Sequence, residues 1–276
     1  MARRGWAGLA VVLILAGVFP RPTEAGRPFL SASDAAVVDP GAVEVEVGIQ
    51  ISRNTRDDND EMTYLLPSAV FNIGIADRVE IDISTGFQLV DDDKEGETLG
   101  SATNTSLILK TLWWEGKDGA PSIATELGVV LPTARKEFQP NEEREIGWGG
   151  RVDVSGELGR LVYILNLGGG VGPSPGVQTN PGDDEDEKAS VFLWALAGEL
   201  SVGGGFAVVS EFQGKVIEDS DNEATALLGL TYTTLAGVKF DFAGFAGLAD
   251  GSDNWGITFG LTFEFPVVSR TAGEGK

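Results

Sequence analysis

The sequence lacks two residue types on which much enzyme and metal chemistry depends. Among its 276 residues there is no histidine and no cysteine. Without histidine there is no Ser-His triad, no histidine-ligated zinc and no imidazole general base. Without cysteine there are no disulfides and no thiolate metal sites, which suits a chain that crosses an oxidising periplasm. We therefore predict that the protein is not an enzyme and carries no cofactor.

Basic residues are scarce. The chain has 20 lysine and arginine residues against 42 acidic ones, which gives a formal net charge of −22. Residues 1–25 carry three arginines and one glutamate, a charge of +2, so the chain without them is near −24. Such a charge repels nucleic acid and anionic lipid headgroups and attracts cations. We predict no nucleic-acid partner.

Long apolar runs are absent except at the amino terminus. Trp6 to Phe19 form an apolar run that follows Arg3 and Arg4 and precedes small residues up to Ala25. This pattern predicts a signal peptide over residues 1–25 that is cleaved after Ala25. A membrane anchor is the alternative, but the run is shorter than the ~20 residues that a spanning helix needs. Any later membrane crossing must use strands.

In place of long apolar runs, the chain shows alternation of large apolar residues with small or polar ones. It is unbroken from Trp255 to Phe265. Because strand side chains point to opposite faces at every second residue, one face of this strand is apolar and the other polar. The apolar face would meet a second sheet in a soluble sandwich, or lipid in an outer-membrane barrel.

The same alternation recurs in twelve segments. The predicted strands lie near residues 43–51, 62–75, 79–88, 107–113, 123–131, 146–158, 163–171, 192–200, 206–213, 228–233, 238–248 and 255–265. Pro67 lies within the second strand and predicts a bulge or a strand edge there.

The connections between these strands alternate in length. Five short turns begin near Ala76, Glu115, Gly159, Val202 and Thr234. The six longer loops are residues 53–61, 90–100, 133–145, 173–187, 217–223 and 249–254. An even strand count with sorted connections is typical of an outer-membrane barrel and not of a Greek-key sandwich. We predict an all-β fold, a 12-stranded antiparallel transmembrane up-and-down β-barrel over residues 41–265, with a periplasmic lead-in (26–40) and a periplasmic tail (266–276).

Charged residues of the predicted strands fall on the polar face. A water-filled lumen can hold them, whereas a carboxylate on the lipid side would cost on the order of 2 kcal/mol near the midplane. The alternative is the solvated face of a soluble sheet. The predicted lumen-lining residues, which are candidates for binding or permeation, are Glu44, Glu46, Glu80, Asp82, Lys110, Glu126, Arg151, Asp153, Glu157, Glu199, Glu211, Lys239, Asp241 and Glu264.

Aromatic residues fall on the apolar face, as expected for rings at the two headgroup levels of a membrane. The predicted membrane-facing aromatics are Phe71, Phe87, Trp113, Trp148, Phe192, Trp194, Phe240, Phe242, Trp255, Phe259, Phe263 and Phe265.

Several short motifs occur in an order that resembles a known family. They are Asp39-Pro-Gly41 followed by Val43-Glu-Val-Glu46, Gly74-Ile-Ala-Asp-Arg-Val-Glu80, Leu131-Pro-Thr133, Asn166-Leu-Gly168, Glu211, and Gly260-Leu-Thr262 with Phe265. In these motifs the chain resembles the bacterial outer-membrane β-barrel family named for phenol degradation (meta pathway), also described as transporter-like. The resemblance implies a twelve-stranded barrel and passage of aromatic or other small hydrophobic compounds.

Two patterns could suggest other chemistry. Gly172-Pro-Ser-Pro-Gly176 matches the Gly-x-Ser-x-Gly pattern of hydrolases, but it lies in a proline-bearing loop and no histidine can activate Ser174. The acidic stretches 91–93 and 183–187 could bind calcium or bridge lipopolysaccharide through divalent ions, but neither has EF-hand spacing. We predict no metal site.

Together these patterns predict a porin-like protein in the outer membrane of a Gram-negative bacterium. We expect a monomeric channel that passes small solutes passively and prefers cations. The alternatives are a non-conducting surface barrel with a structural or adhesion role and a soluble periplasmic binding sandwich. The expected partners are outer-membrane lipid and lipopolysaccharide, the barrel-assembly machinery and a small-molecule solute.

Overall fold

The computed structural model describes residues 30–56, 59–92, 96–117, 119–135, 146–172, 190–218 and 220–267. The predicted signal peptide, most of the predicted tail and most of the loops 133–145 and 173–187 lie outside these residues. In the described part of the chain, no helix is long and apolar enough to cross a membrane.

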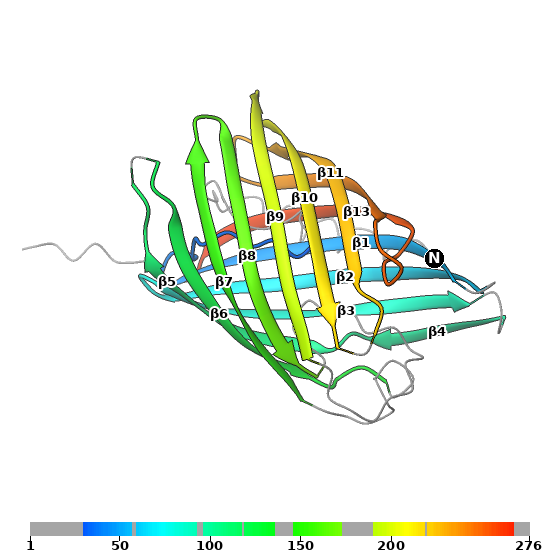
Figure 1. Cartoon of the computed structure of the whole chain (residues 1–276). Helices are drawn as coiled ribbons and strands as arrows, with labels where there is room; N and C mark the ends of the chain where they lie inside the picture. The colour runs from blue at the N-terminus through cyan, green and yellow to red at the C-terminus, as the bar shows by residue number, and fades with distance from the viewer. Residues whose placement is uncertain are drawn as a thin grey trace, which may run out of the picture.

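The described residues form thirteen strand segments of one antiparallel sheet that closes on itself (Figure 1). The segments are β1 (Ala42–Arg56), β2 (Asn59–Ala76), β3 (Val79–Asp92), β4 (Glu97–Ala102), β5 (Thr105–Trp114), β6 (Ser122–Leu131), β7 (Gly147–Leu158), β8 (Leu161–Val171), β9 (Ser190–Gly203), β10 (Phe206–Ile217), β11 (Glu223–Thr233), β12 (Lys239–Gly247) and β13 (Trp255–Pro266). The first and last strands pair with each other, and β2 pairs with both β1 and β3, which closes the wall.

The thirteen segments occupy twelve positions around the wall, because β4 and β5 follow one another along β3. Phe87 of β3 is opposite Ala102 of β4, and Ser84 of β3 is opposite Ser106 of β5. The two segments therefore act as one interrupted strand. The predicted all-β, twelve-stranded barrel is confirmed.

The interruption between β4 and β5 is covered by the chain that follows β6. Thr133 Oγ1 donates a hydrogen bond of 2.9 Å to the carbonyl oxygen of Thr103. The amide of Ala134 donates one of 3.1 Å to Oδ1 of Asn104. The carbonyl of Thr103 and the side chain of Asn104, which lie in the break, thus find hydrogen-bond partners.

Two of the six predicted loops are wrong. The ranges 53–61 and 90–100 are mostly strand, because β1 runs to Arg56, β2 begins at Asn59, and β3 and β4 form a hairpin. An ion pair between Arg53 and Asp60 joins β1 to β2 in this region. These two ranges are predicted as loops because their residues are polar. A strand that extends beyond the apolar band needs backbone hydrogen-bond partners, but it needs no apolar face. The five short turns are as predicted.

The bulge predicted at Pro67 is confirmed. The register between β2 and β3 shifts between Leu65 and Ser68, and that between β1 and β2 shifts between Gly48 and Gln50. Proline cannot donate to a ladder, so the register change places it where no such bond is required.

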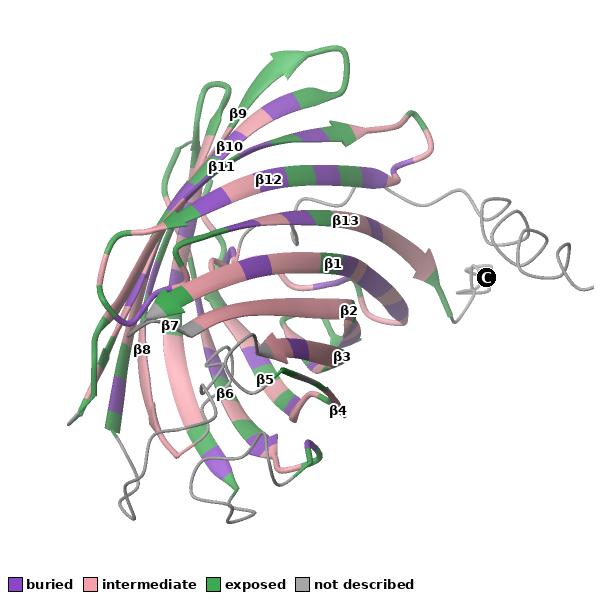
Figure 2. Ribbon diagram, turned by 90° about the vertical axis from the view of Figure 1, so that its right-hand side faces the viewer, coloured by how far each residue is buried: buried purple, intermediate pink, exposed green. Residues whose placement is uncertain are grey.

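Burial alternates along the strands (Figure 2). Large apolar side chains remain exposed on the outer face, including Leu228 at 66%, Leu127 at 64% and Trp148 at 61%. A single closed sheet has no second layer to cover this face, which contradicts the sandwich alternative. Soluble monomers rarely expose a continuous apolar surface, so the outer face of this barrel is expected to contact an apolar solvent.

Candidate functional site in the barrel lumen

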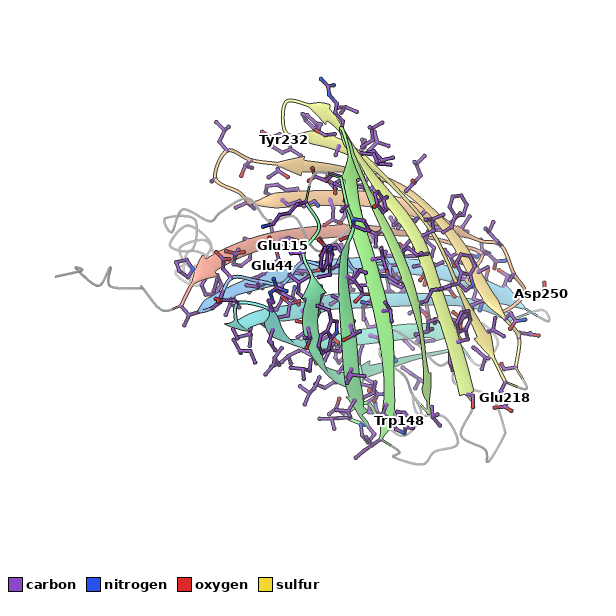
Figure 3. The ribbon with its side chains drawn as sticks, turned by 60° about the vertical axis from the view of Figure 1, so that its left-hand side comes forward. Glu44, Glu115, Trp148, Glu218, Tyr232 and Asp250 are labelled. Carbon is purple, nitrogen blue, oxygen red and sulfur yellow. The ribbon has the colours of Figure 1, made fainter. Side chains whose placement is uncertain are left out.

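The lumen-lining residues predicted from sequence fall into three groups by burial. Figure 3 shows the side chains of both faces, with Glu44, which is 2% exposed, among those labelled. Ten are buried, namely Glu44, Glu46, Glu80, Asp82, Lys110, Glu126, Asp153, Glu211, Lys239 and Asp241. Three are partly buried, namely Arg151, Glu199 and Glu264, and Glu157 at the end of β7 is exposed.

The predicted outer aromatics are exposed or partly exposed. Trp194, Phe263 and Phe265 are partly buried, and the other nine are exposed. Sequence reasoning missed Trp114, which is exposed at 61% beside Trp113. The cause is a register shift between Leu112 and Trp114, which turns two successive rings outward.

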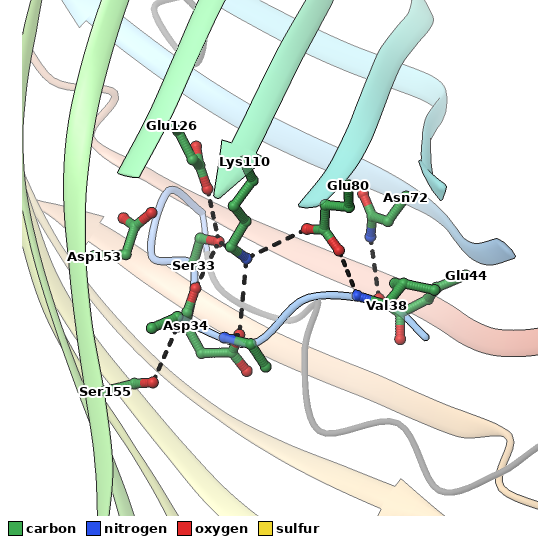
Figure 4. A network of polar contacts seen from close by, with 12 residues as sticks. Ser33, Asp34, Val38, Glu44, Asn72, Glu80, Lys110, Glu126, Asp153 and Ser155 are labelled. Atoms are coloured by element: carbon green, nitrogen blue, oxygen red, sulfur yellow. Dashed lines mark hydrogen bonds and ion pairs between the residues drawn. The ribbon is translucent and has the colours of Figure 1, made fainter. Parts of the chain in front are cut away.

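The lead-in is placed differently from the prediction. Residues 26–40 are expected in the periplasm, but residues 30–38 lie inside the barrel and bond to lumen-facing side chains (Figure 4). We call residues 30–38 the filling segment. The prediction missed it because these residues carry no periodic pattern, and their partners are remote in the sequence.

The amino-terminal end of the filling segment is held by Glu211 of β10. One carboxylate oxygen accepts a hydrogen bond of 2.6 Å from the amide of Leu30. The other accepts bonds of 3.0 Å and 2.8 Å from the amides of Ser31 and Ala32. Hydrogen bonds to a charged acceptor are the stronger kind, and here a single carboxylate takes three consecutive backbone donors.

Leu30 adds an apolar contact to this anchor. It packs against a buried cluster on the inner face of β10, β11 and β12, formed by Val209, Leu227, Ala243 and Phe245. The inner wall therefore carries an apolar cluster among its polar side chains. The sequence pattern did not single out this apolar cluster.

The middle of the filling segment is paired with Asn166 of β8 as if with a strand. The amide of Ser33 donates to Asn166 Oδ1 at 3.0 Å, and Asn166 Nδ2 donates to the carbonyl oxygen of Ser33 at 2.7 Å. Nδ2 also donates to Asp153 at 2.6 Å, which fixes the orientation of the side-chain amide. The buried amide of Ala35 donates to Ser155 Oγ at 3.0 Å.

A row of alternating charges lies beneath the segment. Glu80, Lys110, Glu126 and Arg151 are directly opposite one another on β3, β5, β6 and β7. Lys110 Nζ lies 3.4 Å from Glu80, and Arg151 lies 2.7 Å from Glu126. Opposite charges placed across strands in this way stabilise a sheet.

The filling segment binds this row of charges at several points. Asp34 lies 3.9 Å from Lys110, whose Nζ also donates to Ser33 Oγ at 3.2 Å. Arg151 donates to the carbonyl oxygen of Ser31 at 2.7 Å. The amide of Val38 donates to Glu80 at 2.6 Å. The segment thus passes from β10 to β3 along the inner wall before it enters β1.

Gly74 of β2 makes room where the segment leaves the lumen. A Cβ at this position would overlap the carbonyl oxygens of Val38 and Asp39. The carbonyl of Gly74 accepts a bond of 2.8 Å from the amide of Gly41. Gly74, Asn166 and Glu211 belong to the motifs that carry the family resemblance, and all three contact residues 30–41. Their convergence is the signal that could have placed the segment.

Acidic residues cluster beside this row of charges, on β1, β2 and β3. Asn72 of β2 lies between Glu44 of β1 and Asp82 of β3 in the register. Its Nδ2 donates to Glu44 at 3.0 Å and to Glu46 at 2.7 Å. Among the residues that the structure describes, no three or more acidic side chains are arranged to hold a metal ion. The acidic stretch 183–187 lies outside those residues.

Comparison with known proteins shows the fold. No family model matches the sequence, and no curated protein matches it. An outer membrane channel from Pseudomonas putida F1 superimposes with a TM-score of 0.63 at 11% identity, over 84% of this chain and 98% of that one. The β domain of the Bordetella autotransporter BrkA gives a TM-score of 0.50 at 11% identity, over 82% and 100%. The translocator domain of the autotransporter NalP from Neisseria meningitidis gives 0.50 at 8% identity, over 94% of each chain. The chain therefore has the fold of bacterial outer-membrane β-barrels.

Proposed function

We propose that this protein is an outer-membrane channel that passes small solutes and prefers cations to anions. The observation that carries the proposal is the charge of the inner wall. The fourteen lumen-lining residues comprise eleven acids and three bases. Each base is held by acids: Lys110 by Glu80, Arg151 by Glu126, and Lys239 by Glu199 at 2.9 Å. A wall lined by an excess of one sign concentrates ions of the other sign.

The exposed apolar face supports insertion in a membrane. Outer-membrane barrels present an apolar band to lipid and carry polar side chains inside, and this chain has both features. Lipid and lipopolysaccharide are the proposed contacts of the outer face, and the barrel-assembly machinery is the proposed route of insertion. Export through the signal peptide over residues 1–25 belongs to the same proposal.

Conductance of the purified protein in a planar bilayer tests the proposal. With a potassium chloride gradient across the membrane, we expect discrete current steps and a reversal potential of the sign that a cation-preferring pore gives. A folded barrel that carries no current, or one whose reversal potential has the opposite sign, contradicts it.

Among small solutes, aromatic compounds are the class that we propose this channel passes. The resemblance to the phenol-degradation family implies such compounds, and the buried cluster of Val209, Leu227, Ala243 and Phe245, against which Leu30 packs, shows that the inner wall also carries apolar side chains. Liposome uptake of benzylammonium and of benzoate compares two aromatic ions of similar size and opposite charge. We expect faster uptake of benzylammonium, and equal or slower uptake would remove this class.

A non-conducting surface barrel is the second candidate, and a specific observation favours it. The filling segment occupies the lumen and bonds to side chains of six strands. Figure 4 shows its contacts with Glu80, Lys110, Glu126 and Ser155. If these bonds close the path, the barrel serves as a scaffold for its outer loops. The same bilayer measurement separates the two candidates.

A further inference from the structure

We propose that the filling segment is the selectivity element of this barrel: it sets the size limit of the conduit and strengthens its preference for cations. This inference rests on the proposed channel function. It concerns residues 30–38 and the side chains that hold them, which are Glu80, Lys110, Glu126, Arg151, Ser155, Asn166 and Glu211.

The path of the segment gives the first argument. It bonds to Glu211 on β10, Asn166 on β8, Ser155 on β7 and Glu80 on β3. These strands follow one another around the wall, with only a few between them, so the segment runs along the inner wall across several strands instead of following one strand. A solute that travels along the barrel axis must pass it. A twelve-stranded barrel without a filling has room for a modest lumen, and a chain that lies inside that lumen reduces its cross-section.

The chemistry of the anchors gives the second argument. The wall holds the segment mainly through the segment's own backbone amides and carbonyls, which every residue supplies. Side chains 31–36 are Ser, Ala, Ser, Asp, Ala and Ala, and their small size lets the backbone approach the wall. The wall residues are buried and charged or amide-bearing, as a built binding site requires: Glu211 is 0% exposed and Asn166 is 2% exposed.

The charge of the segment gives the third argument. Its one acidic residue, Asp34, is buried and faces Lys110 at 3.9 Å. The carbonyl oxygen of Ser31 takes a donor from Arg151. The segment therefore adds an acid and a carbonyl dipole beside two of the three lumen bases. Without it, Lys110 and Arg151 would be less compensated, and their field would oppose cations.

Removal of residues 30–38 should have three measurable consequences. Single-channel conductance should rise about two-fold or more, because the cross-section grows. The ratio of cation to anion permeability should fall, because Asp34 leaves and Lys110 and Arg151 face the path. A rise in size limit should appear in liposome swelling with sugars of increasing mass.

A double point variant and a control variant keep the proposal testable if the deletion does not fold. The double variant Glu211→Ala with Asn166→Ala keeps the full chain but removes the anchors of Leu30, Ser31, Ala32 and Ser33, and should reproduce the rise in conductance. Glu223→Gln is the control, because Glu223 pairs with Lys215 and is not one of the lumen-lining residues. It removes one acidic charge outside that set and should leave the sugar size limit at the wild-type value.

The outcomes separate this inference from the proposed function. If wild type and the anchor variants conduct equally, with the same size limit, the selectivity role is overturned while the channel stands. If the folded variants conduct and wild type does not, the segment closes the path completely, which supports its role as the size-limiting element and overturns passive passage through wild type. If none conducts although all are folded by heat-modifiable mobility on gels, both proposals fail.

Discussion

Glu211 and Leu30 lie 181 residues apart in the chain, yet a carboxylate oxygen of Glu211 accepts a 2.6 Å hydrogen bond from the amide of Leu30. The same carboxylate takes the next two amides as well. This contact ties the start of the filling segment to β10, whereas the segment itself leads into β1. The contact therefore forms only when β10 is in the wall and residues 30–32 are inside the lumen.

The first prediction concerns Asn166. Asn166→Ala should cost about 2 kcal/mol of stability, because Ser33 and Asp153 lose partners in a buried region. It should also raise the labelling rate of a thiol at Ala32→Cys, which is the only thiol in a chain without cysteine. Asn72→Ala is the matched control, since Asn72 bonds Glu44 and Glu46 and not the segment. Equal labelling in both variants would argue against docking by Asn166.

The second prediction concerns Lys110, a buried lysine among acids. Lys110→Met should lower the free energy of unfolding by about 3–5 kcal/mol, because it leaves Glu80 and Asp34 without their buried counter-charge. Lys215→Met removes a lysine that pairs with Glu223 at 2.8 Å where that glutamate is 25% exposed. Its cost should be about 1 kcal/mol or less. Urea unfolding in detergent micelles measures both, and equal costs would contradict a special role for Lys110.

The third prediction tests the outer face. Leu228 lies in the middle of β11 and is 66% exposed. Leu228→Arg should destabilise the barrel in vesicles by about 2–4 kcal/mol, the cost of arginine on the lipid side near the midplane. Leu235 lies in the turn between β11 and β12, so Leu235→Arg should cost about 0–1 kcal/mol. If both changes are tolerated equally in a bilayer, lipid does not solvate this face.

The fourth prediction concerns the exit of the segment from the lumen. Gly74→Ala places a Cβ against the carbonyl oxygens of Val38 and Asp39, so the segment must shift. We expect lower thermal stability and faster thiol labelling at Ala32→Cys. Gly244→Ala is the control, because a Cβ there meets only the carbonyl oxygen of Gly256 at 3.8 Å. That variant should be neutral or slightly stabilising, since alanine loses less backbone entropy than glycine.

Strand alternation predicted the fold because the two faces of the wall meet different surroundings. The apolar side chains at Trp255, Phe259 and their neighbours point outward along β13, and the polar ones point inward. The alternation gave wrong predictions where the two faces of a strand do not meet different surroundings. The sequence of residues 53–61 is polar and predicts a loop, but residues 53–56 and 59–61 continue the backbone ladder between β1 and β2. At Leu112 and Trp114 a register shift breaks the period of two, and no local signal marks it.

The candidate site was predictable in part. The inward direction of Glu80, Lys110, Glu126 and Arg151 follows from their place in the alternation, but their alignment in one row depends on strand register. The filling segment was not predictable from periodicity, because it is neither strand nor helix and the wall side chains that bind it lie 42 to 181 residues away. The motif residues Gly74, Asn166 and Glu211 all contact residues 30–41, but only the structure brings them together.

Gly41 joins the filling segment to β1, and so links the filling of the lumen to the closure of the ring. The chain leaves the lumen at this residue and becomes β1, and β1 is the strand that pairs with β13 to complete the ring. A barrel whose last seam forms between its terminal strands would draw residues 30–38 inward during the same step. The pairing of β1 with β13 and the docking of residues 30–38 in the lumen would then occur in a single folding transition.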